Sequence, residues 1–423
     1  MLPIITQASS DFDHTSQATL DSDSVAPLLQ LFGGVTKLKL CFYFVRPEFL
    51  SALAGHSDKR MPDKQLGKLT LYECRFPSHM GMLSEVLKFK SLQRLRIQLD
   101  VGVNVLDIRE CGALLVQQQE QQQQQQLQRL TLDHCIVLGL DELLHLIPSL
   151  RELRLNGVVF PAGMHGLASP SVRVIEMEEI NASFPLHWEF PRLVELKVKK
   201  GITFTDCYDV DTAAVLCNRP ELVQQMASLA LAMDRLPLKF NETLHINLKA
   251  HDGVASNFFA AAGVSLLESL MPLVAKLSFV REFMVQGCPM VHGTVEAICQ
   301  LATGARVIRF LGWNYFEMRW TPFYPENGLL PLVTRIPELQ LLELNMLNSA
   351  TLPGDIIATL LSAVQARRLL HIEINMKTRF IDPSALAPKL HCLKSEWQRV
   401  LEALPEFRGA SFSCNFLGNV YEV

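Results

Sequence analysis

The sequence lacks the segments that carry a chain into or across a membrane. It contains no run of about eighteen apolar residues, and its first residues, MLPIITQASSDFDHTSQATLDSDS, are polar and acidic. A secretory signal needs a basic region followed by an apolar one, which this segment does not have. We therefore expect no membrane partner and a location in the cytoplasm or the nucleus.

Excess basic charge and the common catalytic signatures are also missing. The 39 Lys and Arg residues are outnumbered by 43 Asp and Glu residues, so nucleic acid is not an expected partner. No Walker A sequence, G-x-S-x-G, H-E-x-x-H, G-x-G-x-x-G or C-x-x-C occurs. The ten cysteines are scattered and are expected to be reduced, mostly buried thiols. We therefore expect a protein that is not an enzyme, with no catalytic residues, no cofactor and no bound metal.

What the chain does contain is a short leucine pattern that recurs along most of its length. LQRLTLDHC (residues 127–135) and LGKLTLYEC (residues 66–74) fit L-x-x-L-x-L-x-x-C, and VREFMVQGC (residues 280–288) fits it with other apolar residues. Weaker copies lie near Leu244 and Phe407. Shorter copies begin at Val35, Leu92, Leu150, Val172, Leu193, Ala305, Leu339 and Leu369. So many copies predict a repeating structure rather than one leucine-rich helix.

The segments between the copies share a second pattern. LDELLHLIPSLRELRL, LLPLVTRIPELQLLEL and WQRVLEALPEFRGASF each place apolar residues at helical spacing, then a proline, then a strand. Proline cannot continue a helix and favours extended backbone in the residue before it. This predicts a helix from about Asp141 to Ile147, another at PELVQQMASLALAMDRL, and Asp355 as an N-cap. The closely spaced copies around Leu153, Ile175 and Leu196 predict turns or 3₁₀ segments instead of full helices.

The geometry of β-strands indicates which fold this pattern predicts. Side chains alternate along a strand, so the apolar residues of each copy point to a core and the residues between them point outward. One such unit cannot bury its own apolar face, so units must stack. We expect an α/β solenoid with a curved parallel sheet on the concave side, helices on the convex side, and repeats of about 20–50 residues. It spans residues 27–423 after a disordered polar tail at residues 1–26, and each repeat cysteine lies at the turn leaving the sheet.

These motifs resemble the leucine-rich-repeat superfamily. LQRLTLDHC and LGKLTLYEC are similar to the cysteine-containing and ribonuclease-inhibitor-like subclasses, and to the repeat region of F-box/leucine-rich-repeat proteins. The resemblance implies a non-catalytic scaffold that binds a partner protein on its concave face. The alternative that it implies is a substrate-recognition subunit of a cullin-type ubiquitin ligase, with a ligase adaptor as partner. An F-box precedes the repeats in that family, whereas here SVAPLLQLF is the one helix-like stretch before them, so residues 24–55 would form a degenerate F-box or the module is missing.

Two insertions interrupt the repeats. A glutamine tract at residues 117–126 either lengthens one repeat or forms an association surface. A segment at residues 312–328 is rich in aromatic side chains, which either pack internally or form a protein-binding hot spot. The candidate hot-spot residues are Trp313, Tyr315, Trp320 and Tyr324.

The outward strand positions form the predicted partner-binding face. Those of the first four copies are mainly basic and those of the later copies more acidic, which indicates either ordinary solubilising charge or a docking patch for an acidic partner segment. Under the second reading, reversing the charges of Arg94 and Arg129 weakens partner capture without unfolding the chain. The candidate binding residues are Lys68, Tyr72, Arg94, Arg96, Arg129, Asp133, Arg154, Asn156, Glu176 and Glu178.

Overall fold

The chain divides into two compact units. Unit 1 comprises residues 1–178 and 183–197, and unit 2 comprises residues 179–182 and 198–423. The computed structural model describes residues 4–6, 18–31, 35–59, 65–77, 79–99, 105–109, 126–160, 164, 166–181, 184–203, 220–247, 265–286, 292–311, 329–346, 355–376, 383–404, 409–416 and 419–422.

Unit 1 contains a parallel sheet whose strands pair in the order in which they occur along the chain. A further strand, β14 (Glu195–Thr203), begins in unit 1 and ends in unit 2. The pairings between its described strands are parallel, so each strand returns to the same end of the sheet before the next begins. The strands are β1 (Ile4–Thr6), β3 (Lys37–Cys41), β5 (Lys68–Cys74), β6 (Arg94–Leu99), β8 (Arg129–Asp133), β10 (Glu152–Asn156) and β12 (Val174–Asn181).

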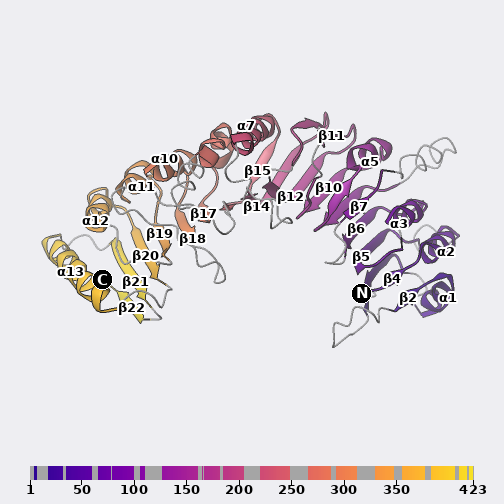
Figure 1. Ribbon diagram of the computed structural model, residues 1–423, viewed down its shortest axis with the longest axis horizontal. Coiled ribbons are helices and arrows are strands. Elements are labelled where there is room, and N and C mark those ends of the chain that lie inside the picture. The colour runs from indigo at the N-terminus through magenta and orange to yellow at the C-terminus, as the bar shows by residue number, and fades with distance from the viewer. Residues whose placement is uncertain are drawn as a thin grey trace. The chain divides into compact units, whose positions relative to one another are not determined.

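The helices of unit 1 cover one face of this sheet (Figure 1). They are α1 (Ser22–Leu31), α2 (Pro47–Asp58), α3 (His79–Val86) and α5 (Leu140–Leu146). Pairs of short parallel strands also lie between the main strands: β2 (Thr19–Leu20) with β4 (Phe44–Val45), β7 (Val105–Asp107) with β9 (Ile136–Leu138), and β11 (Gly166–Ala168) with β13 (His187–Glu189). The closely spaced copies therefore lack full helices in their described crossovers, as expected, but contain the strands β11 and β13 instead of 3₁₀ segments.

Unit 2 follows the same plan. Its parallel strands are the end of β14, then β16 (Thr243–Asn247), β17 (Glu282–Gln286), β18 (Val307–Leu311), β19 (Leu341–Met346), β20 (Leu370–Met376) and β21 (Ala410–Phe416). Beside them β15 (Leu238–Phe240) pairs with β14, and β22 (Asn419–Glu422) pairs antiparallel with β21. The helical segments lie along one side of the strands and are α7 (Pro220–Asp234), η2 (Met271–Leu273), α9 (Val274–Leu277), α10 (His292–Leu301), α11 (Leu330–Arg335), α12 (Ile356–Gln365) and α13 (Pro383–Ala403). No described helix has the length and apolar content that crossing a bilayer requires.

The core consists of the alternate strand residues and the helix faces opposite them. Leu69 and Leu71 of β5 are fully buried, and Leu153 of β10 is likewise 0% exposed. Burying one such side chain contributes roughly 1.5–3 kcal/mol to stability. The apolar residues of the repeat are therefore the main source of stability, and the residues between them face away from the helices.

One backbone contact recurs where the long strands begin. The N–H groups of Gly67 and Lys68 both donate to the carbonyl of Thr36, at 2.9 and 3.1 Å, and those of Gln93 and Arg94 both donate to Gly67. The same double contact is accepted in unit 1 by Gln93, Gln128, Arg151 and Arg173, and in unit 2 by Glu242, Arg281 and Arg306. Successive strands therefore enter their sheet with the same offset.

A left-handed residue marks the turn where the strands of unit 1 end. Phe42, Glu73, His134 and Gly157 have positive φ values of 64°, 50°, 50° and 58°, and each follows one of the aligned strand residues. Cys74 and Cys135 come next in the chain and are each 1% exposed. Cys135 thus lies at the turn leaving the sheet, as expected, whereas Cys74 is the last residue of β5 and pairs with Leu99. Cys288 lies outside the described residues.

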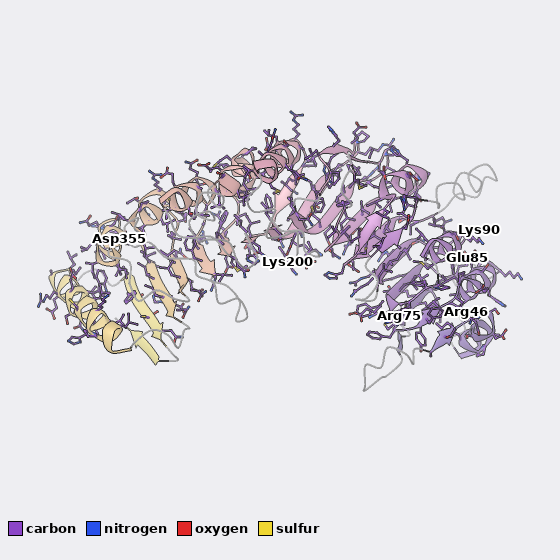
Figure 2. All side chains as sticks on the ribbon, viewed as in Figure 1. Arg46, Arg75, Glu85, Lys90, Lys200 and Asp355 are labelled. Atoms are coloured by element: carbon purple, nitrogen blue, oxygen red, sulfur yellow. The ribbon has the colours of Figure 1, made fainter. Side chains whose placement is uncertain are left out.

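Helix α11 is held at both ends by the repeat that follows it. Asp355, which is labelled in Figure 2, lies at the N-cap position of α12, as expected. Its carboxylate accepts a hydrogen bond from the N–H of Leu330, the first residue of α11, at 2.8 Å. At the other end of α11, the Arg368 guanidinium donates to the carbonyls of Val333 and Ile336, at 2.5 and 3.3 Å. Side chains of one repeat thus satisfy the terminal backbone groups of the previous helix.

Several expected boundaries differ from those observed. The segment at residues 1–26, expected to be a disordered tail, contains β1, β2 and the first residues of α1. Helix α5 covers Leu140–Leu146 rather than Asp141–Ile147, because left-handed Gly139 (φ 81°) precedes it. Helix α7 confirms the expected helix at PELVQQMASLALAMDRL. The glutamine tract, apart from Gln126, and the aromatic insertion with Trp313, Tyr315, Trp320 and Tyr324 lie outside the described residues.

Gly201 provides a test of the close approach between β14 and β16. A Cβ atom at Gly201 would lie 1.8 Å from the backbone carbonyl oxygen of His245, its partner in the neighbouring strand. We expect Gly201→Ala to lower the free energy of unfolding by about 1–3 kcal/mol, because the strands must separate to admit the methyl group. As a control, Gly55→Ala on α2 meets nothing within 4 Å and should raise it by about 0.5–1 kcal/mol. Urea denaturation followed by circular dichroism measures both, and equal stabilisation by the two variants would contradict the expectation.

The buried cysteines provide a second test. Burial raises the pKa of the Cys74 and Cys135 thiols to about 12, whereas Cys392 on α13 is exposed. Because the thiolate is the reactive form, an alkylating reagent at about pH 8 should modify Cys392 in the folded protein and spare the other two. All three should react after denaturation. Peptide mass spectrometry distinguishes the sites, and rapid modification of Cys74 in the folded protein would show that the turn opens.

Candidate functional site

The face of the unit 1 sheet that points away from the helices carries three rows of aligned side chains. We call them the entry, middle and exit rows, from the start of the strands to their end. The entry row is Lys37, Lys68, Arg94, Arg129 and Glu152. The middle row is Lys39, Thr70, Arg96, Thr131, Arg154 and Glu176. The exit row is Cys41, Tyr72, Gln98, Asp133 and Asn156. Neighbours within a row are about 4.8 Å apart, since they lie on adjacent strands.

The structure brings nine of the ten candidate binding residues into these rows. The tenth, Glu178, lies on β12 two residues after Glu176. Exposure varies among them: Arg94 and Arg96 are exposed, Lys68, Tyr72, Arg129 and Arg154 are partly exposed, and Asp133 is buried. The predicted residues therefore share one face, but they do not present equal surface to a partner.

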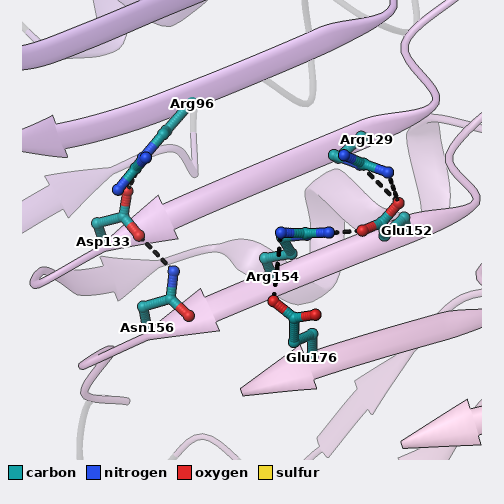
Figure 3. Close-up of polar contacts among 7 residues, drawn as sticks. All are labelled: Arg96, Arg129, Asp133, Glu152, Arg154, Asn156 and Glu176. Atoms are coloured by element: carbon teal, nitrogen blue, oxygen red, sulfur yellow. Dashed lines mark hydrogen bonds and ion pairs between the residues drawn. The ribbon is translucent and has the colours of Figure 1, made fainter. Parts of the chain in front are cut away.

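One carboxylate, Glu152, binds the arginines of both β8 and β10, and a second, Glu176, binds the arginine of β10. Glu152 accepts hydrogen bonds from Nε of Arg129 at 2.5 Å and from Nε of Arg154 at 2.6 Å (Figure 3). Nη1 of Arg154 also lies 3.3 Å from a carboxylate oxygen of Glu176 on β12. Charge-assisted contacts of this kind are stronger than neutral hydrogen bonds and hold the guanidinium planes in fixed orientations. The chain Arg129–Glu152–Arg154–Glu176 is therefore a preformed, nearly neutral network.

A second contact chain neutralises Arg96. Its Nε donates to Oδ2 of Asp133 at 2.5 Å, and the Asn156 side-chain amide donates to the other oxygen of Asp133 at 2.6 Å (Figure 3). The Asp133 side chain is only 2% exposed. A buried carboxylate needs both a cation and hydrogen-bond donors to offset the loss of water. Arg96 and Asn156 supply them, so these two residues support the face as well as lining it.

These pairings reduce the basic patch that the sequence predicts. Arg96, Arg129 and Arg154 are bound to carboxylates, while Lys37, Lys68 and Arg94 form no ion pair with any described residue. Reversing the charge of Arg129 would place a carboxylate beside Glu152, so this substitution would disturb the fold as well as the surface. Sequence reasoning missed the pairing because it depends on which residues face each other across strands.

An aromatic pair borders the cations at the end of β5. Lys39 Nζ lies 4.7 Å from the centre of the Tyr72 ring, within the range of a cation–π contact. The Phe42 ring meets Tyr72 edge to face, with ring centres 5.7 Å apart. Hydrogen bonding with Glu73, burial and the Glu73 charge raise the pKa of the Tyr72 phenol. Tyr72 therefore stays protonated and combines an apolar ring with a polar group, as binding residues often do.

The equivalent face of unit 2 is organised around Arg309. Its guanidinium bonds Glu282 on β17 at 2.7 Å and also pairs with Glu343 on β19. Oε1 of Glu343 accepts further hydrogen bonds from the amides of Asn345 and Asn375, at 3.0 and 3.3 Å. This face is therefore a network of carboxylates and amides with one central cation among these residues.

Asparagine recurs directly after the second inward residue of several strands. In unit 2, Asn345, Asn375 and Asn415 lie opposite one another in register, and Asn375 is only 8% exposed. Asn156 of unit 1 has the same place in ELRLN, and Asn247 has it in TLHIN. Within the described residues, no group of three or more His, Cys, Asp or Glu side chains is arranged to hold a metal ion.

Glu152 tests the ion-pair network. Glu152→Gln leaves Arg129 and Arg154 without their shared carboxylate, which is only 18% exposed. We expect the free energy of unfolding to fall by about 1–3 kcal/mol. The matched change Glu338→Gln removes a carboxylate that is 54% exposed and 3.9 Å from Arg306, so it should cost less than about 1 kcal/mol. Guanidinium titrations compare the variants, and equal losses would mean that the network adds nothing beyond an ordinary surface pair.

Two comparisons with known proteins find no match for this chain. No protein-family model matches the chain. No curated protein sequence is significantly similar to it. The aligned rows of charged and aromatic side chains on the exposed faces of the sheet are therefore the features that indicate function.

Proposed function

We propose that this chain is a non-catalytic scaffold that binds a partner protein on the exposed face of a leucine-rich-repeat solenoid. The observation that carries the proposal is the set of aligned side-chain rows, fixed by strand register and cross-strand ion pairs. This face would be the concave face of such a solenoid, and the helices would form its convex side.

The repeated strand entry supports the solenoid. The double hydrogen bond to one carbonyl recurs between successive strands within each unit, and the cysteine turn recurs in unit 1. Each strand–crossover element buries its leucines only against its neighbours, which is the condition under which repeats stack in a linear array. The leucine pattern of the sequence and the parallel strand order are both in agreement with this architecture.

The chemistry of the rows favours protein binding over catalysis. Tyrosine and arginine are enriched at the energetic centres of protein interfaces. Here Tyr72, Arg96 and Arg154 are held in place by neighbours on adjacent strands. Side chains that are already ordered lose little conformational entropy on binding, so more of the contact energy appears as affinity.

The ligase alternative receives less support from the first helices. Residues 24–55 would need to form a helical module separate from the repeats. Instead, α1 and α2 alternate with β3 and β4, and α2 begins directly after β4. These helices are crossovers of the unit 1 sheet, so we place the partner on the sheet face and not on a separate adaptor-binding module.

Paired surface variants test the proposal. Tyr72→Ala with Gln98→Ala alters the exit row, while Lys90→Ala with Glu142→Ala alters exposed residues beside the unit 1 helices. Partners are recovered by affinity purification from extracts and quantified by mass spectrometry. The first variant should lose about fivefold or more of its partner, because interface hot spots contribute about 1–2 kcal/mol or more, and the second should retain it.

Both variants must melt within a few degrees of the unaltered protein for the comparison to count. Retention of the partner by the exit-row variant, together with its loss from the helix-side variant, would place the interface on the helices and contradict the proposal.

A further inference from the structure

Three cations lie side by side on unit 1 without a carboxylate partner among the described residues. Lys37, Lys68 and Arg94 occupy directly opposed positions on β3, β5 and β6. None of them forms an ion pair with a described residue, and Lys37 and Arg94 are exposed. We call these three residues the open cation row. It spans two strand spacings, or roughly 10 Å.

The neighbouring arginines, unlike the residues of the open cation row, are paired with carboxylates. Moving along the entry row, the next cation is Arg129, and Glu152 on the following strand binds it. In the middle row, Asp133 binds Arg96 and Glu176 binds Arg154. Carboxylates therefore bind Arg96, Arg129 and Arg154 but are absent from the described surroundings of the open cation row.

This arrangement costs stability. Like charges directly opposite each other across a sheet are destabilising. Burial, and then the charges of Arg94 and Lys37, lower the pKa of Lys68. Residues that perturb one another in this way cluster at functional sites. In these three cations the described rows of unit 1 contain a run of opposed charges that an added anion would neutralise.

We propose that the open cation row binds an acidic peptide segment of a partner protein, with Lys37, Lys68 and Arg94 each contacting its carboxylates. This inference rests on the proposed protein-binding function and names the chemistry of the partner. An extended peptide rises about 3.3 Å per residue, so three or four residues cover the row. Tyr72, with Lys39 over its ring, lies four residues along β5 from Lys68 on the same face and receives an apolar residue beside the acidic run.

The length of the row and its boundary favour a short peptide over nucleic acid. Duplex DNA carries a charge about every 1.7 Å along its axis and needs a long cationic track. Beyond Arg94, a duplex following the row would meet Glu152 on β10, and on β12 it would meet Glu176 and Glu178. A peptide with three or four consecutive acidic residues ends before those carboxylates.

Fluorescence anisotropy with the full chain tests the inference. The probe is a fluorescein-labelled peptide with four consecutive glutamates, and the matched peptide carries four glutamines. Lys68→Gln with Arg94→Gln should raise the dissociation constant of the glutamate peptide about tenfold or more, because close opposite charges are lost. The control, Lys59→Gln with Lys90→Gln, removes the same net charge from exposed residues beside the unit 1 helices and should change it less than about twofold.

Stability gives an independent readout of the same variant. Because it relieves repulsion within the row, Lys68→Gln with Arg94→Gln should melt at the same temperature as the unaltered chain or higher. Binding that weakens while stability is kept supports the inference. Equal binding of the glutamate peptide by this variant and the control overturns it, as does equal binding of the glutamine peptide or tighter binding of a single-stranded oligonucleotide through the same residues.

The partner-capture experiment separates this inference from the proposed function. If the exit-row variant loses the partner and the Lys68, Arg94 variant keeps it, the sheet face is the interface and the acidic-segment inference fails. If neither variant loses the partner, the proposed function fails as well. Loss in both variants supports the two proposals together.

Discussion

The organisation of both units depends on one backbone contact, the carbonyl that accepts two consecutive N–H groups from the next strand. In unit 1 the series runs from Thr36 through Gly67 and Gln93, and in unit 2 it includes Arg281 and Arg306. A shift of one residue at any of these points would turn every leucine of that strand outward, since strand side chains alternate. The contact therefore determines both which residues form the core and which residues meet across the exposed face.

Strand register determines which charged side chains of neighbouring strands bind one another on this face. Glu152 is placed where it can bind arginines from its own strand and from β8, and Arg309 is placed between carboxylates on β17 and β19. A residue on this face is thus best understood through its neighbours on adjacent strands, not through its neighbours in sequence. The difference between the arginines that are paired with carboxylates and the open cation row becomes visible only when residues on neighbouring strands are compared.

The repeat pattern predicted the parallel α/β sheet, the inward leucines and the position of Cys135 at the turn leaving the sheet, because each depends on local periodicity. It also placed nine candidate residues in the three rows. It did not predict the strands β11 and β13 or the pairing of β1 with β3, since these short elements are formed by contacts between distant segments. The neutralisation of Arg96 and Arg129 could not be predicted either, because Asp133 and Glu152 are 37 and 23 residues away in sequence and only the register brings them close.

The two ends of α11 carry a consequence for how the chain folds during synthesis. Asp355 and Arg368, which bind the first N–H and the last carbonyls of this helix, are made after it. A six-residue helix has too few hydrogen bonds of its own to persist in water. As the ribosome releases the chain, the terminal backbone groups of α11 therefore gain these partners only after the following repeat has emerged. Residues that are synthesised later thus bind the ends of a helix that is synthesised earlier.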